Sequence, residues 1–476
     1  MKASESEGIE GKVFLVTGGL GFVGAALCLE LSRRGARQVR ALDIRHVSPF
    51  KPALLDSSIT CLQGNIADQP TVRSAMQGAD CVFHLAAYGI SGKETLQSAR
   101  IDQINIAATC HILDSCVSLG VSRLVYVSTY DVVFGGKEIL NGNESLPYFP
   151  TERHVDHHSS SKSIAERLVL KYNGRPLTGK IGQRLYTAAV RPAEIYGPGE
   201  ERRFPRIISA ASKGLFLFKI GDDTARTDFV YVDNLVLALL LTSVGLSVDF
   251  HGGDPVAAGQ AYFISDGSPV NTYQFLRPLL TGLGYELPTL SVTVQQALYL
   301  SKVVWFVYVL MYPWLDRGWV PQPLILPAEV HKVGVTHYFS YLKAREELGY
   351  VPRVSPEEGM AATVRYWVNK RNEWVDGPTV GVWLFAVVGM MLFTCAAYVP
   401  GVEPIVPVRE LCVAIFGSLW VVRVACAVAW ALHIGEAGYA WVLARRVDPD
   451  NAYKWFWQTL ALGYFSLRFL IKKANR

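Results

Sequence analysis

The hydrophobic residues of this chain follow two different patterns, which meet near residue 376. Before that point, short apolar runs with a β-branched and aromatic bias alternate with longer segments that have one apolar helical face. The runs predict strands at 13–17, 38–43, 59–63, 80–87, 123–129 and 187–192, and the longer segments predict helices at 25–34, 68–76, 98–119 and 159–172. Strands separated by helix-length segments predict an α/β fold, with a doubly wound, Rossmann-type parallel sheet covered on both faces.

After that point the chain contains long apolar segments that carry little charge. Residues 379–399 contain no charged side chain, and residues 411–432 contain only Arg423. About 20 apolar residues are enough for a helix to cross a bilayer. We therefore predict spanning helices at both segments and a third, weaker one at 455–471, in a C-terminal α-helical transmembrane region.

Basic residues near the predicted spans indicate an orientation. A Lys-Arg pair at 370–371 precedes the first span, and an Arg-Arg pair at 445–446 lies between the second and the third. Because cytoplasmic loops carry an excess of Lys and Arg, we expect both pairs and the chain before the spans on the cytosolic side. Three crossings leave the Lys-Lys pair at 472–473 on the other side, and a short fourth span near 437–443 would bring it back.

Composition excludes some classes of function. The net charge is only +5 over 476 residues, and there is no long basic run or zinc-finger spacing, so we expect no nucleic acid partner. Half of the residues are hydrophobic, and the excess lies in the tail, which favours a membrane-associated protein. The eight cysteines form no C-x-x-C pair, which favours a reducing compartment, and residues 1–8 lack the apolar core of a secretory signal.

A strand, a glycine turn and a helix follow one another near the start of the chain. The predicted strand runs into Gly18, Gly21 and Gly24, and good helix formers come next. In this arrangement the glycines let the backbone approach a pyrophosphate, and the helix start offers it unpaired N–H groups. The following strand ends in Asp43, about where a ribose-binding acid is expected. The pattern predicts a dinucleotide site.

Further motifs follow in a fixed order along the chain. They are Thr17-Gly-x-x-Gly-x-x-Gly24, His84-Leu-Ala-Ala87, Asn105, Tyr126-Val-Ser-Thr129, Ser161-Lys162 and Arg191-Pro-Ala-Glu-Ile-Tyr-Gly-Pro-Gly199. With this set, about residues 8–370 resemble an extended short-chain dehydrogenase/reductase of the 3β-hydroxysteroid dehydrogenase/isomerase family. A second set narrows the resemblance to the family 42E subgroup: Tyr88-Gly-Ile-Ser-Gly92, Asp131-Val-Val-Phe-Gly-Gly136, and the segments 143–148, 263–267 and 334–340.

The resemblance implies NAD as the cofactor and assigns its contacts. Pyrophosphate would be held by Gly18, Gly21, Phe22, Val23 and Gly24, the adenosine ribose by Asp43, the adenine by Asn65 and Ile66, and the nicotinamide end by Lys162 and Pro192. Asn65 departs from the Asp that is usual in the family, although an amide oxygen still accepts from the adenine amino group. The hydroxyl that polarises the substrate oxygen would be Thr129 or Ser128, and Thr129 is favoured.

The active site departs from the family at one position. A tyrosine usually lies four residues before the lysine, one helical turn away on the same face, and moves the proton during hydride transfer. Four residues before Lys162 stands His158. Histidine then takes over the proton transfer, or the site binds ligands with little turnover, or His158 is a solvated helix residue. The neighbouring His154, Asp156 and His157 have no partner cluster, and we predict no metal site.

These observations predict a domain at 8–376 and a multi-span membrane domain at 377–476. In the first, the nucleotide-binding core covers about 8–200 and 228–250, and the rest forms a smaller substrate lobe. The segment 291–312 is apolar but interrupted by Gln and Lys, which favours a helix lying in the membrane interface.

The expected function is that of a membrane-anchored, NAD-dependent 3β-hydroxysteroid dehydrogenase-like oxidoreductase. It would transfer a hydride between NAD and the 3β-hydroxyl or 3-keto group of a steroid or sterol. The alternative is a catalytically weak or inactive nucleotide- and lipid-binding membrane protein, because His158 replaces the tyrosine. A transporter is disfavoured, since only the last hundred or so residues look membrane-embedded. We expect the endoplasmic reticulum as the location, and a homodimer is compatible with the resemblance.

Overall fold

The computed structural model describes residues 8–46, 48–57, 59–90, 92–247, 254–315, 325–371, 375, 377–399 and 405–474. The chain forms two compact units. The first comprises Met1–Phe204, Phe218–Leu279 and Thr289–Val364, and the second comprises Pro205–Leu217, Leu280–Pro288 and Arg365–Arg476. The predicted domain boundary at residue 376 falls on a residue outside the described ranges.

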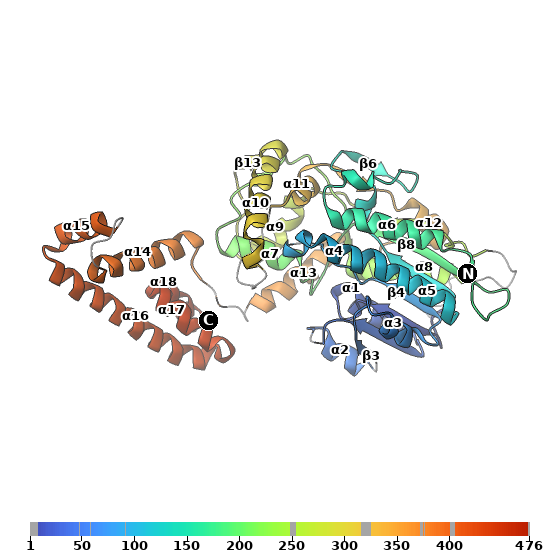
Figure 1. The fold of residues 1–476 in the computed structure, drawn as a ribbon, viewed down its shortest axis with the longest axis horizontal. Helices are drawn as coiled ribbons and strands as arrows, with labels where there is room; N and C mark the ends of the chain where they lie inside the picture. Colours follow the sequence, from blue (N-terminus) through green and yellow to red (C-terminus); the bar gives the residue numbers. More distant parts are fainter. Residues whose placement is uncertain are drawn as a thin grey trace. The chain divides into compact units, whose positions relative to one another are not determined.

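A twisted sheet forms the centre of the first unit (Figure 1). Its strand order is β12-β8-β5-β4-β1-β2-β3, and every neighbouring pair along this order is parallel. The strands are β1 Val13–Thr17, β2 Gln38–Asp43, β3 Thr60–Gln63, β4 Cys81–His84, β5 Arg123–Val127, β8 Arg184–Pro192 and β12 Ala261–Ile264, with β7 Arg175–Pro176 antiparallel to β8. The order reverses between β1 and β4, where doubly wound sheets bind their ligands. The predicted fold is confirmed.

Two apolar layers cover the faces of this sheet. Residues that alternate along the strands point to opposite sides, as the pleat requires. On one face, Phe14 and Val16 belong to a buried cluster with residues of helices α1 (Phe22–Arg33) and α8 (Val232–Gly245). On the other face, Val13 and Leu15 belong to a cluster with residues of α3 (Gln69–Met76), α5 (Ala108–Leu119) and α6 (His157–Lys171).

The remaining elements of the chain up to residue 371 are short or lie beyond the sheet. The helices are α2 Lys51–Asp56, α4 Ser98–Asp102, α7 Arg203–Ser212, α9 Thr272–Gly282, α10 Val294–Leu315, α11 Pro327–Gly334, α12 Leu342–Leu348 and α13 Pro356–Arg371. Single helical turns lie at Gly92–Leu96, Gln103–Ala107, Tyr130–Val132 and Thr151–Arg153. Three strand pairs complete the set: β6 Ile139–Gly142 with β14 His337–Phe339, β9 Glu194–Tyr196 with β11 Phe229–Tyr231, and β10 Lys219–Ile220 with β13 Ser291–Val292.

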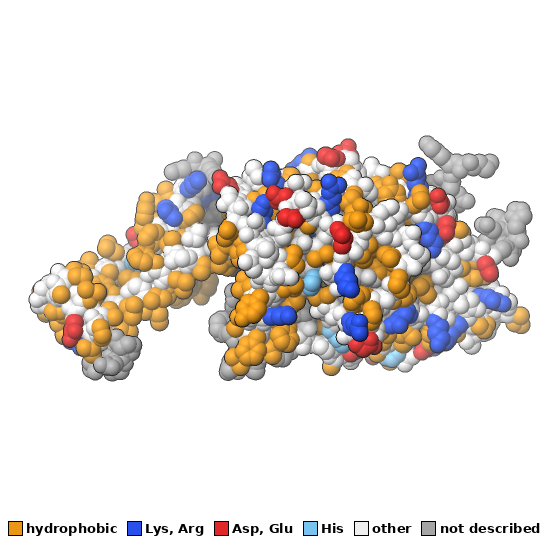
Figure 2. All heavy atoms as spheres, turned by 90° about the horizontal axis from the view of Figure 1, so that it is seen from above, with side chains coloured by type: hydrophobic (Ala, Val, Ile, Leu, Met, Phe, Trp, Pro, Cys, Tyr) orange, Lys and Arg blue, Asp and Glu red, His pale blue; other side chains and the backbone are white. Residues whose placement is uncertain are grey.

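Among the residues that the structure describes after residue 376, the second unit contains five helices. They are α14 Val380–Tyr398, α15 Ile405–Phe416, α16 Leu419–Val447, α17 Ala452–Leu462 and α18 Tyr464–Ala474, with a single turn at Pro449–Asn451 between α16 and α17. Figure 2 shows hydrophobic side chains over most of the visible face of this region. By length and composition α14 and α16 are able to cross a membrane, and their apolar residues are mostly exposed.

Two of the three predicted spans have to be corrected. The segment 411–432 is not one helix, because Gly417 at φ +84° separates α15 from α16. The second helix that is long and apolar enough to cross a membrane instead begins at Leu419 and continues to Val447. The segment 455–471 is also not one helix, since Gly463 at φ +58° separates α17 from α18, and each has only 11 residues. Apolar composition alone did not reveal these breaks.

Candidate nucleotide-binding and active site

The glycine turn between β1 and α1 is closed too tightly for larger residues. Gly18 has φ +70°, and a Cβ on Gly24 would lie only 2.2 Å from the Gly18 carbonyl oxygen. Helix α1 begins at Phe22, and no side chain caps its first turn. The first N–H groups of α1 therefore remain available to an anion.

Asp43 lies directly beside this turn. Its carboxylate accepts hydrogen bonds from the Leu20 N–H (3.1 Å) and from the Arg45 N–H (3.0 Å), and the residue is only 7% exposed. The Arg45 guanidinium is 3.6 Å from Asp43 and 3.0 Å from Glu201. The carboxylates of Asp43 and Glu201 therefore flank the Arg45 guanidinium.

Three further residues assigned to the nucleotide, Asn65, Ile66 and Pro192, lie at ends of the sheet strands. Asn65 and Ile66 follow β3, where the Gly64 N–H donates to the Asp43 carbonyl oxygen (2.9 Å). Asn65 is exposed and its side-chain oxygen accepts from the Ala67 N–H (3.0 Å), whereas Ile66 is buried. Pro192 ends β8 and is buried beside Ile264 of β12.

Two hydroxyl groups follow β5, and they have different surroundings. The Thr129 hydroxyl donates to Asp131 Oδ2 (3.0 Å) and accepts from the Asp131 N–H (3.2 Å), so it caps the single turn 130–132. The Ser128 hydroxyl is buried and has no hydrogen-bond partner among the residues that the structure describes. Of the two, only Ser128 has a donor that no protein group occupies.

His158 lies in the first turn of α6 and is almost completely buried, at 9% exposure. Its Nδ1 is 2.9 Å from the Tyr88 carbonyl oxygen. A carbonyl oxygen only accepts, so we assign the proton to Nδ1, which leaves a lone pair on Nε2. Burial, and then the charge of Lys162, lower the pKa of His158 to about 3. The imidazole is therefore neutral at pH 7 and able to accept a proton, and it is not a solvated residue.

Asn105 fixes the backbone of Tyr88, whose carbonyl group positions His158. Its side-chain oxygen accepts from the Tyr88 N–H (2.8 Å), and its amide nitrogen donates to the Tyr88 carbonyl oxygen (3.0 Å) and to the Ser161 hydroxyl (2.9 Å). Asn105 lies in the turn Gln103–Ala107, a π-helical turn that joins α4 to α5. The sequence includes Asn105 in the family motif, but nothing in the sequence indicates this role.

Lys162 lies one turn after His158 on α6, and its side chain is buried. Its Nζ donates to the Val127 carbonyl oxygen (2.6 Å) and is 4.0 Å from the centre of the Tyr126 ring. Burial lowers the pKa of Lys162 to about 7, although the charge of Glu166 raises it. The lysine thus reaches the end of β5, next to Ser128.

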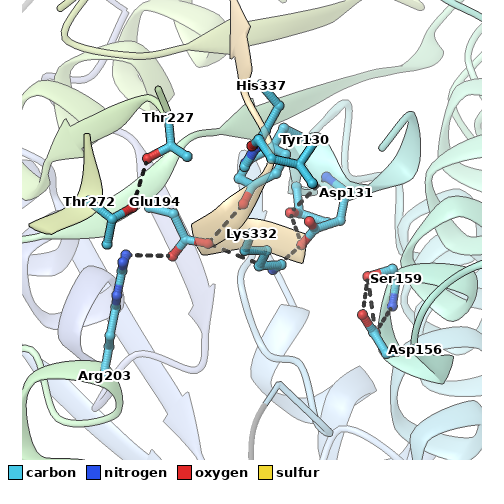
Figure 3. A network of polar contacts seen from close by, with 12 residues as sticks. Tyr130, Asp131, Asp156, Ser159, Glu194, Arg203, Thr227, Thr272, Lys332 and His337 are labelled. Carbon is cyan, nitrogen blue, oxygen red and sulfur yellow. Dashed lines mark hydrogen bonds and ion pairs between the residues drawn. The ribbon is translucent and has the colours of Figure 1, made fainter. Parts of the chain in front are cut away.

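A polar network lies beside these residues and comes from distant parts of the chain (Figure 3). Lys332 of α11 is 2.6 Å from Asp131 and 3.7 Å from Glu194, and Arg203 is 3.2 Å from Glu194. Burial raises the pKa of Glu194, but Lys332 and Arg203 outweigh it and lower that pKa to about 2. Sequence reasoning missed Lys332, because no motif or spacing connects α11 with β5.

Two models of known protein families match this chain, and together they cover most of it. A model of the 3-beta hydroxysteroid dehydrogenase/isomerase family matches residues 15–294, and a model named Transmembrane protein 254 matches residues 381–472.

The alignments with several relatives cover most of this chain and most of each relative. Short-chain dehydrogenase/reductase family 42E member 1 of Danio rerio is 46% identical over 344 residues, which are 72% of this chain and 85% of the relative. The Homo sapiens protein of the same name is 45% identical over 354 residues, covering 73% and 85%. A 3beta-hydroxysteroid-dehydrogenase/decarboxylase of Arabidopsis thaliana is 33% identical over 363 residues, covering 74% and 78%.

Solved structures support the fold. A dTDP-glucose 4,6-dehydratase from Streptomyces venezuelae with NAD and TYD bound has a TM-score of 0.57 at 23% identity, covering 76% of this chain and 98% of that one. A UDP-glucose 4-epimerase from Thermotoga maritima has a TM-score of 0.54 at 21% identity, covering 75% and 99%. At these identities the similarity shows the fold alone.

Proposed function

Because this chain belongs to the 3-beta hydroxysteroid dehydrogenase/isomerase family, we propose that it is an NAD-dependent oxidoreductase that acts on the 3β-hydroxyl or 3-keto group of a steroid or sterol. The observation that carries the proposal is the pair on α6. A neutral His158 with a lone pair on Nε2 stands one helical turn before a buried Lys162, where the family resemblance places the proton-transferring group.

The glycine turn and Asp43 fit a dinucleotide. The turn has no space for a Cβ at Gly24, the start of α1 is uncapped, and a carboxylate lies against the turn at Leu20. Phe22, Val23 and Gly24 would offer their N–H groups to the pyrophosphate, and Asp43 would accept from the ribose hydroxyls. Asn65, Ile66, Lys162 and Pro192 would hold the adenine and nicotinamide ends. Bound NAD supplies the hydride acceptor.

The protein residues would handle the proton of the substrate hydroxyl. His158 Nε2 accepts this proton when the alcohol is oxidised, and Nδ1–H keeps its bond to the Tyr88 carbonyl oxygen. That carbonyl also stabilises the positive charge that appears on the ring. Asn105 acts as a positioning residue, since its side chain binds both the N–H and the carbonyl oxygen of Tyr88.

The unoccupied hydroxyl of Ser128 predicts which side chain polarises the substrate oxygen. We expect Ser128→Ala to lower kcat by about 10²-fold, the usual cost of losing one donor to a developing oxyanion. Thr129→Val removes a hydroxyl that is already bound to Asp131, so it should reduce thermal stability while changing kcat far less. Measuring kcat and Tm for both variants tests this, and a larger kcat loss in Thr129→Val would return the role to Thr129.

We expect NAD to bind at least about tenfold more tightly than NADP, which corresponds to about 1.4 kcal/mol. Asp43 repels a 2′-phosphate, and Glu201 competes for Arg45, the cation that would otherwise pair with it. Titration calorimetry with both nucleotides measures the ratio. Glu201→Gln should reduce the ratio of the two dissociation constants, because Arg45 is then free to pair with a 2′-phosphate. Equal dissociation constants in the wild type would refute the prediction.

The second part of the proposal concerns the membrane. Two exposed apolar helices, α14 and α16, would anchor the chain as a multi-pass protein of the endoplasmic reticulum with the catalytic unit in the cytosol. Helix α10 exposes Tyr299, Trp305 and Phe306, which suits a helix in the membrane interface near a lipid substrate.

One observation favours a second candidate function, a nucleotide- and lipid-binding protein without turnover. A pKa of about 3 makes His158 a weak base, so proton transfer would be slow even with correct geometry. Incubating the purified protein with NAD and a panel of 3β-hydroxysteroids, followed by mass spectrometry of the sterols, tests both candidates. The 3-keto product, absent with Lys162→Ala, supports the oxidoreductase. Tight NAD binding without any keto product supports the second candidate.

A further inference from the structure

The helices α17 and α18 form a hairpin that is too short to cross a bilayer. Each has 11 residues, which corresponds to a length of about 16 Å, whereas the hydrocarbon core is about 30 Å thick. The chain reverses at Gly463, whose φ of +58° favours glycine.

The two open ends of this hairpin meet at the same end of α16. Asp448 directly follows α16 and accepts from the Trp455 indole N–H (2.9 Å), near the start of α17. The same Oδ2 atom is 2.7 Å from Nζ of Lys473, near the end of α18. A helix pair that crossed the bilayer as one span would separate Trp455 and Lys473 by the membrane thickness. Their shared partner excludes that arrangement.

The tip of the hairpin lies against the middle of α16. Polar side chains of α16 contact the backbone there, where the helical hydrogen bonding is interrupted between α17 and α18. His433 Nδ1 is 3.0 Å from the carbonyl oxygen of Leu460, which lies in the last turn of α17. A Cβ on Gly463 would lie 2.8 Å from Glu436 Oε2 and 2.9 Å from His433 Nε2, so the two side chains enclose this glycine. Irregular backbone is tolerated at membrane depth when protein groups bury it in this way.

The position of the tip along α16 sets its depth. Between Arg423 and Arg445 the helix rises about 33 Å, close to the thickness of the hydrocarbon core. His433 and Glu436 lie near the middle of this stretch, so the enclosed Gly463 would lie near the bilayer centre.

We propose that α17 and α18 form a re-entrant hairpin, which enters one leaflet from the side of residues 369–371 and returns to that side. The partner of its exposed aromatic residues, Tyr453, Trp457 and Tyr464, is then the lipid of this single leaflet. Of the helices that the structure describes, only α14 and α16 then cross the bilayer. This inference rests on the proposed membrane anchoring of residues 377–474.

The charge distribution agrees with two crossings. The pairs at 370–371, 445–446 and 472–473 all fall on one side, whereas three crossings separate the last pair from the other two. Two arginines lie near the opposite side of the membrane, and their guanidinium groups bind carbonyl oxygens at the end of a helix. Arg409 donates to the Ala396 carbonyl oxygen (2.9 Å) and Arg423 to that of Ala397 (3.0 Å), both at the C-terminal end of α14.

Cysteine labelling in sealed microsomes of the full chain tests the hairpin. Four single substitutions are compared with the parent chain: Asn369→Cys, Glu410→Cys, Tyr464→Cys and Lys472→Cys. A membrane-impermeant maleimide should label Lys472→Cys and Asn369→Cys alike, and Glu410→Cys only after the membrane is permeabilised. Tyr464→Cys, next to the tip, should be labelled only after detergent removes the lipid.

Other outcomes overturn the proposal in distinguishable ways. If Lys472→Cys behaves like Glu410→Cys, the last segment crosses the bilayer and the hairpin is wrong, while anchoring stands. If Tyr464→Cys is labelled before detergent is added, the hairpin lies outside the lipid. If all four react at once and alkaline carbonate extracts the protein, the anchoring itself is wrong. Gly463→Leu should shift Lys472→Cys toward the protected class, and Gly435→Leu, with open space around its Cβ, serves as the matched control.

Discussion

The variant His158→Tyr is expected to oxidise 3β-hydroxysteroids faster than the wild type, by about 10-fold to 10²-fold. Tyrosine restores the proton-transferring group that the family resemblance places one turn before Lys162, and its longer side chain reaches further toward the substrate than imidazole. A well-placed acid or base contributes about 10²–10⁴ in rate, and the wild-type histidine should supply only part of this. Steady-state kcat with NAD and a shared steroid panel measures the difference.

The pH dependence separates the two proton acceptors. The pKa of His158 is about 3, so the imidazole is already neutral above pH 5 and the wild-type rate should show no rise that depends on it between pH 5 and 9. A phenol must lose its proton before it accepts another, so the rate of His158→Tyr should rise with pH over this range. A change near pH 7 that both proteins share would belong to Lys162. Identical profiles would contradict the role of residue 158.

The second large effect is expected at Gly24. A Cβ there would lie 2.2 Å from the Gly18 carbonyl oxygen, and the atoms that this Cβ would crowd all belong to the backbone. Gly24→Ala must therefore open the turn, at a cost of about 1–3 kcal/mol. If the whole cost appears in binding, the affinity for NAD falls by up to about 10²-fold.

The matched control for this prediction is Gly21→Ala. The nearest protein atom to a Cβ at Gly21 is the Gly18 carbonyl oxygen at 3.1 Å, so the folded chain accommodates it with a small shift. We expect Gly21→Ala to keep the Tm of the wild type but to weaken NAD binding, because the new methyl group lies where the pyrophosphate approaches. Gly24→Ala should lower both the Tm and the affinity for NAD. Unchanged NAD affinity in Gly24→Ala would show that the turn does not bind the nucleotide.

Local patterns predicted the nucleotide half of the molecule well. The strand that runs into Gly18 and the strand that ends at Asp43 form β1 and β2, and the Leu20 N–H joins the turn to the carboxylate. A chain segment of this kind specifies its own geometry, because the glycines and the helix start are neighbours in sequence. The lysine and the residue one turn before it were placed together for the same reason.

Features that depend on distant segments were not predictable. One contact that was missed is local: sequence reasoning favoured Thr129 over Ser128 as the hydroxyl that polarises the substrate oxygen, whereas the Thr129 hydroxyl donates to Asp131, two residues further on. Lys332 and the Asn105 contact with Tyr88 depend on tertiary packing. The hairpin at Gly463 was missed because hydropathy counts apolar residues and does not register one glycine that reverses the chain.

The central claim is that His158 accepts the proton while hydride leaves the steroid, and one labelling experiment tests it most directly. A 3β-hydroxysteroid that carries deuterium at C3 is mixed with the NAD complex of the wild type, His158→Tyr, His158→Ala and Lys162→Ala in single turnovers. Deuterium in the recovered NADH reports hydride transfer. We predict rates that fall in the order His158→Tyr, wild type, His158→Ala, with Lys162→Ala also below the wild type. Equal rates for the wild type and His158→Ala would contradict the claim.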